Sequence, residues 1–216
     1  MRIVIAGGHG QIALLLSHRL SGRGDSVVGL IRNPAHAAEV VASGAEPVTA
    51  DLEATDAAAL AEHLAGADAV VFAAGAGPGS GPERKQTVDL GAAIKLIRAC
   101  QAAGVQRYLM VSAMGAADPT SGPEQMVPYL KAKAGADEAL RESGLRYTVV
   151  RPGRLTDDPP TGGVRIGERL DRGEVTRADV AAVLAACLDT PATENTTFDL
   201  LGGDTPVEEA LTALGG

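Results

Sequence analysis

The sequence predicts a doubly wound α/β fold, a mostly parallel sheet of six to seven strands with helices on both faces. Short β-branched runs alternate with longer Ala-rich stretches along most of the chain. Several of the short runs are apolar throughout, as strands covered on both faces tend to be. This alternation implies parallel strands joined by right-handed crossovers. The expected strands are Arg2–Ala6, Ser26–Ile31, Glu46–Thr49, Ala69–Phe72, Arg107–Val111 and Arg146–Val150, with a seventh near Thr197–Leu200.

Seven helices are expected along the same alternation. Thr176 with Asp179, and Thr205 with Glu208, have the spacing of capping boxes and indicate where the last two helices begin. The expected helices are Gln11–Leu20, Pro34–Ser43, Thr55–Leu64, Pro82–Ala103, Val127–Glu142, Arg177–Leu188 and Pro206–Leu214.

The length of 216 residues predicts a single domain that covers residues 1–216. The glycine-rich segment 75–82 has the composition of a linker, but the alternation resumes directly after it. We therefore interpret it as a mobile loop after the fourth strand. The 65 residues after Arg151 are too few for an independent domain. Residues 151–176, which are polar and rich in turn formers, are expected to form a small substrate lid.

Composition argues against several classes of partner. A net charge of −8 and an aromatic content of 2% disfavour nucleic acid. No apolar run approaches the roughly 18 residues of a membrane span. The four histidines lack metal-ligand spacing, so no metal site is expected. Cys100 and Cys187 are interpreted as buried thiols in a reducing compartment. We expect a cytoplasmic protein that acts on a small molecule as a monomer or a homodimer.

A glycine-rich turn follows the first strand and opens the first helix. Gly7 and Gly10 let the backbone turn sharply and approach a ligand, while Ala13 lets the helix pack closely. The unpaired amides of a helix start suit a diphosphate, although such glycines can also be purely structural. The expected cofactor-binding residues here are Gly7, Gly8, His9, Gly10, Gln11 and Ile12.

The ends of the next strands supply further candidates. Arg32 follows the second strand, where a cation suits the 2′-phosphate of NADP; the alternative is a plain surface arginine. Asp51, beside Leu52, either accepts from an adenine amino group or caps the turn before Thr55. Small residues after the fourth strand would let a ribose lie against the backbone; these are Ala73, Ala74 and Gly75.

Three residues later in the chain have the character of an acid–base site. Ser112 follows Val111 at the end of the fifth strand. Tyr129 and Lys133 are four residues apart, so they share a helix face and can converge on one ligand, whereas Lys131 points elsewhere. The alternative for the Tyr129–Lys133 pair is an ordinary surface contact.

Together these residues resemble a known family. Gly7-Gly8-His9-Gly10, Val111-Ser112, Tyr129-Leu130-Lys131-Ala132-Lys133 and Val150-Arg151-Pro152-Gly153 resemble the atypical short-chain dehydrogenases/reductases. More narrowly, they are similar to the NAD(P)H-binding group near the NmrA-like proteins and the biliverdin-reductase-B-like flavin reductases. The resemblance spans nearly the whole chain and implies a Rossmann domain.

The resemblance also implies roles. Tyr129 would act as general acid toward a substrate carbonyl while hydride arrives from the nicotinamide, and Ser112 would donate to the developing oxyanion. Lys133 would lower the pKa of Tyr129 and bond the nicotinamide ribose. Val111 and the segment Arg151, Pro152 and Gly153 would border the nicotinamide; the segment could also be a rigid turn.

Two classes of function remain open at this point. The first is an NADP-dependent oxidoreductase, with NAD less favoured, that acts on a small carbonyl, quinone-like or flavin-like substrate. The second is a non-catalytic NADP(H)-binding redox sensor, which the NmrA-like resemblance implies and the fold alone cannot decide. A nucleotide-sugar epimerase is disfavoured because its relatives use a longer C-terminal region than the 65 residues present here.

Overall fold

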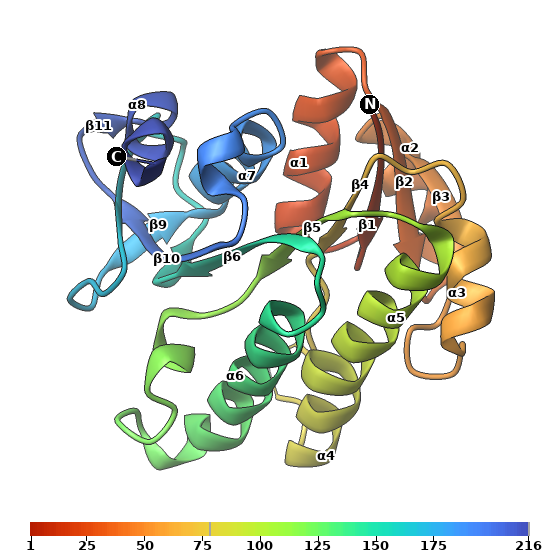
Figure 1. Ribbon diagram of the computed structural model, residues 1–216, viewed down its shortest axis with the longest axis horizontal. Helices are drawn as coiled ribbons and strands as arrows, with labels where there is room; N and C mark the ends of the chain where they lie inside the picture. Colours follow the sequence, from red (N-terminus) through yellow and green to blue (C-terminus); the bar gives the residue numbers. More distant parts are fainter. Residues whose placement is uncertain (78, 216) are drawn as a thin grey trace.

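The structure, a computed structural model, describes residues 1–77 and 79–215 (Figure 1). Within them, one sheet has the strand order β11-β8-β10-β6-β5-β4-β1-β2-β3. The seven strands from β10 to β3 are parallel, and β8 and β11 are antiparallel to their neighbours. The strands are β1 (Arg2–Ala6), β2 (Ser26–Ile31), β3 (Glu46–Thr49), β4 (Ala69–Phe72), β5 (Arg107–Val111), β6 (Arg146–Pro152), β8 (Gly163–Gly167), β10 (Thr196–Gly202) and β11 (Thr205–Pro206).

Helices cover both faces of the sheet, as predicted. The helices α1, α2, α7 and α8 pack on one face, and α3, α5 and α6 on the other. The helices are α1 (Gln11–Gly22), α2 (Ala37–Ala42), α3 (Ala57–His63), α4 (Pro82–Arg84), α5 (Ala93–Ala103), α6 (Val127–Arg141), α7 (Arg177–Cys187) and α8 (Val207–Thr212). Among the described residues, no helix is long and apolar enough to cross a membrane.

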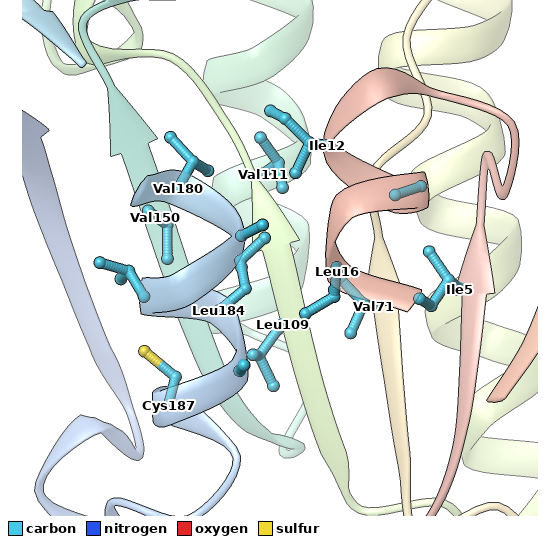
Figure 2. Packing of buried hydrophobic residues seen from close by; sticks show 14 of the residues in the cluster. Ile5, Ile12, Leu16, Val71, Leu109, Val111, Val150, Val180, Leu184 and Cys187 are labelled. Atoms are coloured by element: carbon cyan, nitrogen blue, oxygen red, sulfur yellow. The ribbon is translucent and has the colours of Figure 1, made fainter. Parts of the chain in front are cut away.

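Alternating side chains of the parallel strands feed two separate hydrophobic layers. In β5, Leu109 and Val111 face α1 and α7, while Tyr108 and Met110 face α5 and α6. Figure 2 shows the first layer, where Leu16 of α1 and Leu184 of α7 lie over the sheet. Cys100 and Cys187 are free and buried, and burial raises the pKa of each thiol to about 12.

The predicted strand number was too low. The predicted seven strands are all present, but the sheet has nine because β8 and β11 extend it beyond β10. The segment expected to be a lid also contains β7 (Arg154–Thr156) and β9 (Glu174–Thr176), which pair with each other. These strands are two to five residues long, so each carries too short a pattern to be recognised in the sequence.

Of the two helix starts predicted from capping boxes, the structure confirms one and contradicts the other. Thr176 caps α7, as predicted, because its side-chain oxygen accepts the N–H of Asp179. The capping box at Thr205 was wrong. Thr205 pairs with Val164 in β11, and α8 begins only at Val207.

The predicted helix Pro82–Ala103 has three parts. Between α4 and α5 the chain forms a π-helix, η2 (Lys85–Ala92). The wider turn is the kind of irregularity often found at functional sites. The predicted loop before it, residues 75–82, includes Pro78, which lies outside the described residues; residues 79–81 precede α4.

The glycine turn after β1 is wedged between neighbouring strands. Gly7 has φ of +84°, and a Cβ there would lie 2.6 Å from Cα of Ala74. A Cβ on Gly8 would lie 2.6 Å from Cα of Gly29 in β2. Only glycine allows these approaches, because each added atom would overlap backbone that cannot rotate away.

We predict that Gly8→Ala destabilises the protein by about 1–3 kcal/mol, since the added methyl group must displace the β2 backbone. Gly22→Ala is the matched control, because a Cβ there has nothing within 4 Å. Urea unfolding of both variants measures the difference. A Gly8→Ala variant as stable as Gly22→Ala would contradict the close packing of this turn.

Candidate functional site

A pocket of about 310 Å³ opens above the glycine turn at the carboxyl edge of the sheet. No side chain caps the first turn of α1, whose N-cap is Gly10. The amides of this turn therefore face the opening without a side-chain partner. The predicted residues that line the pocket are Gly7, His9, Gly10, Arg32, Asp51, Leu52, Ala73, Ala74 and Gly75.

Asp51 fulfils the capping alternative and also borders the pocket. Its Oδ1 accepts the N–H of Glu53 at 2.9 Å, and its backbone oxygen accepts the N–H of Thr55. Its other carboxylate oxygen takes no hydrogen bond from a described residue. The two interpretations of Asp51 are therefore compatible, because capping uses one oxygen and an adenine amino group needs only the other.

Two arginines flank the mouth of the pocket and share one carboxylate. Arg32 Nη1 lies 3.5 Å from Glu53 Oε2, and Arg84 Nη2 lies 3.2 Å from the same oxygen. The Thr87 hydroxyl donates to Glu53 at 2.6 Å. This hydrogen bond and Arg84 lower the pKa of Glu53. The mouth thus carries two guanidinium groups, of which sequence analysis identified one.

His9 of the glycine turn stacks on His36, which follows β2 and also lines the pocket. The two rings are 3.7 Å apart, and Nε2 of His9 lies 3.1 Å from the carboxylate of Glu39. The stack ties the turn to the segment after Arg32.

Lys133 is buried on α6 and held at two points. Its Nζ donates to the backbone oxygen of Val111 at 3.1 Å and lies 3.3 Å from Oδ1 of Asp89. Asp89 is fully buried in the π-helix, and its Oδ2 accepts the N–H of Ala76 at 3.3 Å. The ammonium group is therefore fixed beside the end of β5 and the loop that follows β4.

Tyr129 lies one helical turn before Lys133. The Nζ atoms of Lys85 and Lys133 lie 5.3 Å and 6.0 Å from the centre of its ring. We expected Lys133 to lower the pKa of the phenol, but burial raises it, and the carboxylates of Asp89 and Asp137 raise it further. The expectation fails mainly because burial disfavours the phenolate, and the Asp89 carboxylate, which pairs with the ammonium group, repels it further.

Ser112 completes the predicted trio on the same face of the sheet. Its Oγ is buried with no hydrogen-bond partner among the described residues. Close to it on α6, Asp137 is fully buried and its Oδ2 accepts from Nε of Arg151 at 2.9 Å. Burial raises the pKa of the Asp137 carboxyl, while the positive charge of Arg151 opposes the rise.

The remaining residues that were predicted to bind the cofactor do not line the first pocket. Gln11 is exposed, and Gly8 packs on β2. Ile12 and Val111 belong to the hydrophobic layer in Figure 2. The segment that begins with Arg151 continues β6 as far as Pro152, which pairs with β10, so it is not simply a turn. Gly153 then leads into β7.

Sequence analysis missed four charged residues at this edge: Glu53, Arg84, Asp89 and Asp137. Two of them carried a usable signal. Asp137 follows Lys133 by four positions and so shares its helix face. Asp89 precedes Ala93 and Leu96 at helical spacing, which places a carboxylate on an apolar face. Glu53 and Arg84 meet only through the tertiary fold.

Comparison with known proteins agrees with this geometry. The model of a family described as NAD(P)H-binding matches residues 7–191. The chain belongs to this NAD(P)H-binding family. The match includes the glycine turn and the residues from Ser112 to Arg151. A nicotinamide dinucleotide carries a diphosphate, which suits the uncapped amides of this turn.

Relatives extend along the whole chain. YhfK of Bacillus subtilis, named an uncharacterized sugar epimerase, is 41% identical over 99% of this chain and 100% of its own length. A solved structure from Bacillus halodurans, named provisionally as an NAD-dependent epimerase/dehydratase, is 38% identical with a TM-score of 0.93 and covers 99% of both chains. The NAD(P)H azoreductase of Xenophilus azovorans is 27% identical over 93% of this chain and 68% of its own.

We predict that Lys133→Met destabilises the protein by about 3–5 kcal/mol, because it leaves the Asp89 carboxylate buried without a counter-charge. Adding Asp89→Asn should restore much of the loss. Lys131→Met, an exposed neighbour on the same helix, is the control. Urea unfolding measures the free energy of unfolding of each variant. Equal losses of stability in Lys133→Met and Lys131→Met would rule out a buried ion pair.

Proposed function

We propose that the protein is an NADP-dependent reductase that transfers hydride to a small carbonyl, quinone-like or flavin-like substrate, with Tyr129 as general acid. One observation carries the proposal: the uncapped glycine turn and the Tyr129–Lys133 pair lie at the same edge of the sheet, joined by the Asp89 contacts to Lys133 and Ala76. Ligands of open parallel sheets bind at this edge.

The residues present fit the cofactor. The diphosphate would bind the amides at the start of α1, and the ribose would lie against Ala73, Ala74 and Gly75. Arg32 and Arg84 would hold a 2′-phosphate in place of the Glu53 carboxylate. Lys133 would donate to the nicotinamide ribose from its fixed position beside Val111.

When bound, the cofactor supplies the hydride that reduces the substrate carbon. Tyr129 would donate its phenolic proton to the substrate oxygen, so that a carbonyl becomes an alcohol and a tyrosinate remains to be reprotonated by solvent. The raised pKa of Tyr129 keeps the phenol protonated at neutral pH. The unpartnered Ser112 hydroxyl would donate a hydrogen bond to the same oxygen as charge develops there.

A second candidate function is favoured by the names of two relatives. YhfK and the Bacillus halodurans protein are named for epimerase chemistry and match this chain over nearly its full length. The argument that an epimerase needs a longer chain is therefore weakened. The two functions differ in cofactor use, because a reductase consumes NADPH and an epimerase returns the hydride to its own substrate. The azoreductase name supports the reductase.

For the acid, we predict that Tyr129→Phe lowers kcat/KM for NADPH-dependent reduction of an aldehyde or quinone at least a hundredfold, since proton transfer by a positioned acid contributes about 10²–10⁴-fold. The Kd for NADPH should stay unchanged. Tyr147→Phe, on β6, is the control. NADPH absorbance measures turnover, and equal rates for Tyr129→Phe and the wild type would remove Tyr129 from the chemistry.

For the cofactor, we predict that NADPH binds more tightly than NADH and that Arg32→Ala weakens NADPH binding about tenfold, a loss of about 1.4 kcal/mol, without affecting NADH. Arg98→Ala, an exposed arginine on α5, is the control. Fluorescence titration of the wild type and both variants with NADPH and NADH gives the six dissociation constants. If the wild type binds NADH as tightly as NADPH, the assignment of Arg32 to the 2′-phosphate is wrong.

A further inference from the structure

A second cavity, of about 420 Å³, lies apart from the glycine turn. Its walls are α6, the segment after β5 and the segment after β8. The apolar part comes from Ala116, Ala117 and Ala134, and the polar part from three arginines and two glutamates. None of its residues lines the first pocket.

The sheet explains which side chains reach this cavity. Val111 and Val150 are paired in β5 and β6, and both face α1 and α7. Because side chains alternate along a strand, the next residues, Ser112 and Arg151, face α6 instead. Arg151 is also paired with Asp199 of β10. Ser112, Arg151 and Asp199 therefore form a row across three adjacent strands beneath α6.

Arg151 is anchored on its buried side and open on the other. Its Nε donates to Asp137 at 2.9 Å, and only 8% of the residue is exposed. The two terminal nitrogens have no hydrogen-bond partner among the described residues. Unlike the buried unpartnered atoms of the protein, they remain accessible to solvent. Since Arg151 lines the cavity, these nitrogens reach its interior.

Charges around the cavity favour an anion at Arg151. Arg141 is paired with Glu138 on α6. Arg169 and its neighbour Glu168 are both exposed at the mouth, and neither forms an ion pair with a described residue. Asp137, which accepts from Arg151, and Asp199, its partner across β6 and β10, do not line the cavity. Of the three arginines in the lining, Arg151 is the buried one, while Arg141 and Arg169 are exposed.

We propose that this second cavity is the substrate pocket and that it takes a carbonyl compound bearing a carboxylate, which Arg151 binds through its terminal nitrogens. The planar guanidinium fork matches a carboxylate in two parallel hydrogen bonds. Ser112 directly follows the adjacent strand β5, and neighbouring strands are about 5 Å apart, so its hydroxyl lies one strand away from Arg151. This inference rests on the proposed reductase function.

The test compares two acceptors that differ only in charge: 4-carboxybenzaldehyde and its methyl ester, with NADPH as donor. We expect the KM for the acid to be about tenfold below that for the ester. Arg151→Lys keeps the charge beside Asp137 but loses the fork, so it should raise the KM for the acid about tenfold. Arg169→Ala should raise it two- to fivefold. Arg169→Ala should not change the KM for the ester.

Arg165→Ala is the control, because Arg165 is exposed on β8 and does not line the cavity. It should change neither KM. If Arg151→Lys does not fold, Arg169→Ala and the wild-type comparison decide the question. Equal KM values for acid and ester in the wild type would overturn the proposal.

A binding measurement separates the two proposals. Calorimetry should detect benzoate binding to the wild-type protein at least tenfold tighter than benzamide binding, with a weaker benzoate affinity in Arg169→Ala. If neither aldehyde is reduced but benzoate binds in this way, the reductase function fails and the anion site stands. If the aldehydes are reduced and benzoate does not bind more tightly than benzamide, the anion site fails and the reductase function stands.

Discussion

The close backbone packing of the glycine turn is the constraint on which the site depends. Gly7 and Gly8 lie against the backbones of the loop after β4 and of β2, at distances that leave no room for a side chain. The turn is fixed between two strands, and α1 starts at the carboxyl edge with its first amides uncapped. Because parallel strands all end at that edge, whatever the turn binds lies beside the residues that follow the other strands.

Helix α6 brings two buried ion pairs to the same edge. It supplies Lys133 to Asp89 of the π-helix and Asp137 to Arg151 of β6. Burying such pairs contributes little net stability, because desolvation offsets the attraction. They fix the position of charges instead. One pair places an ammonium group beside the first pocket, and the other aims a guanidinium group into the second. The fold therefore holds a cation ready on the cofactor side and another on the proposed substrate side.

The elements with a local signal were predictable. The apolar runs gave the parallel strands, and the Thr176 cap gave the start of α7. The strands β8 and β11 were not predictable, because both are short and the pairings of β8 with β10 and of β11 with β8 form only in the folded chain. In the site, the glycine turn and the Tyr129–Lys133 spacing were readable in sequence. Glu53 and Arg84 were not, since residues 31 positions apart meet only in the folded chain. The direction of the Tyr129 pKa shift was predicted wrongly, because the burial of the phenol and its proximity to Asp89 and Asp137 depend on the tertiary fold.

The central claim is that the uncapped start of α1 binds the diphosphate of a nicotinamide dinucleotide. A crystal structure of the protein soaked with NADPH tests it most directly, with calorimetry on the same sample. We expect the diphosphate oxygens within hydrogen-bond distance of the amides of Gln11 and Ile12, together with measurable heat of binding; the Gly10 amide already donates to Gly7. Electron density that leaves this turn empty, with no heat of binding for NADPH or NADH, would contradict the account.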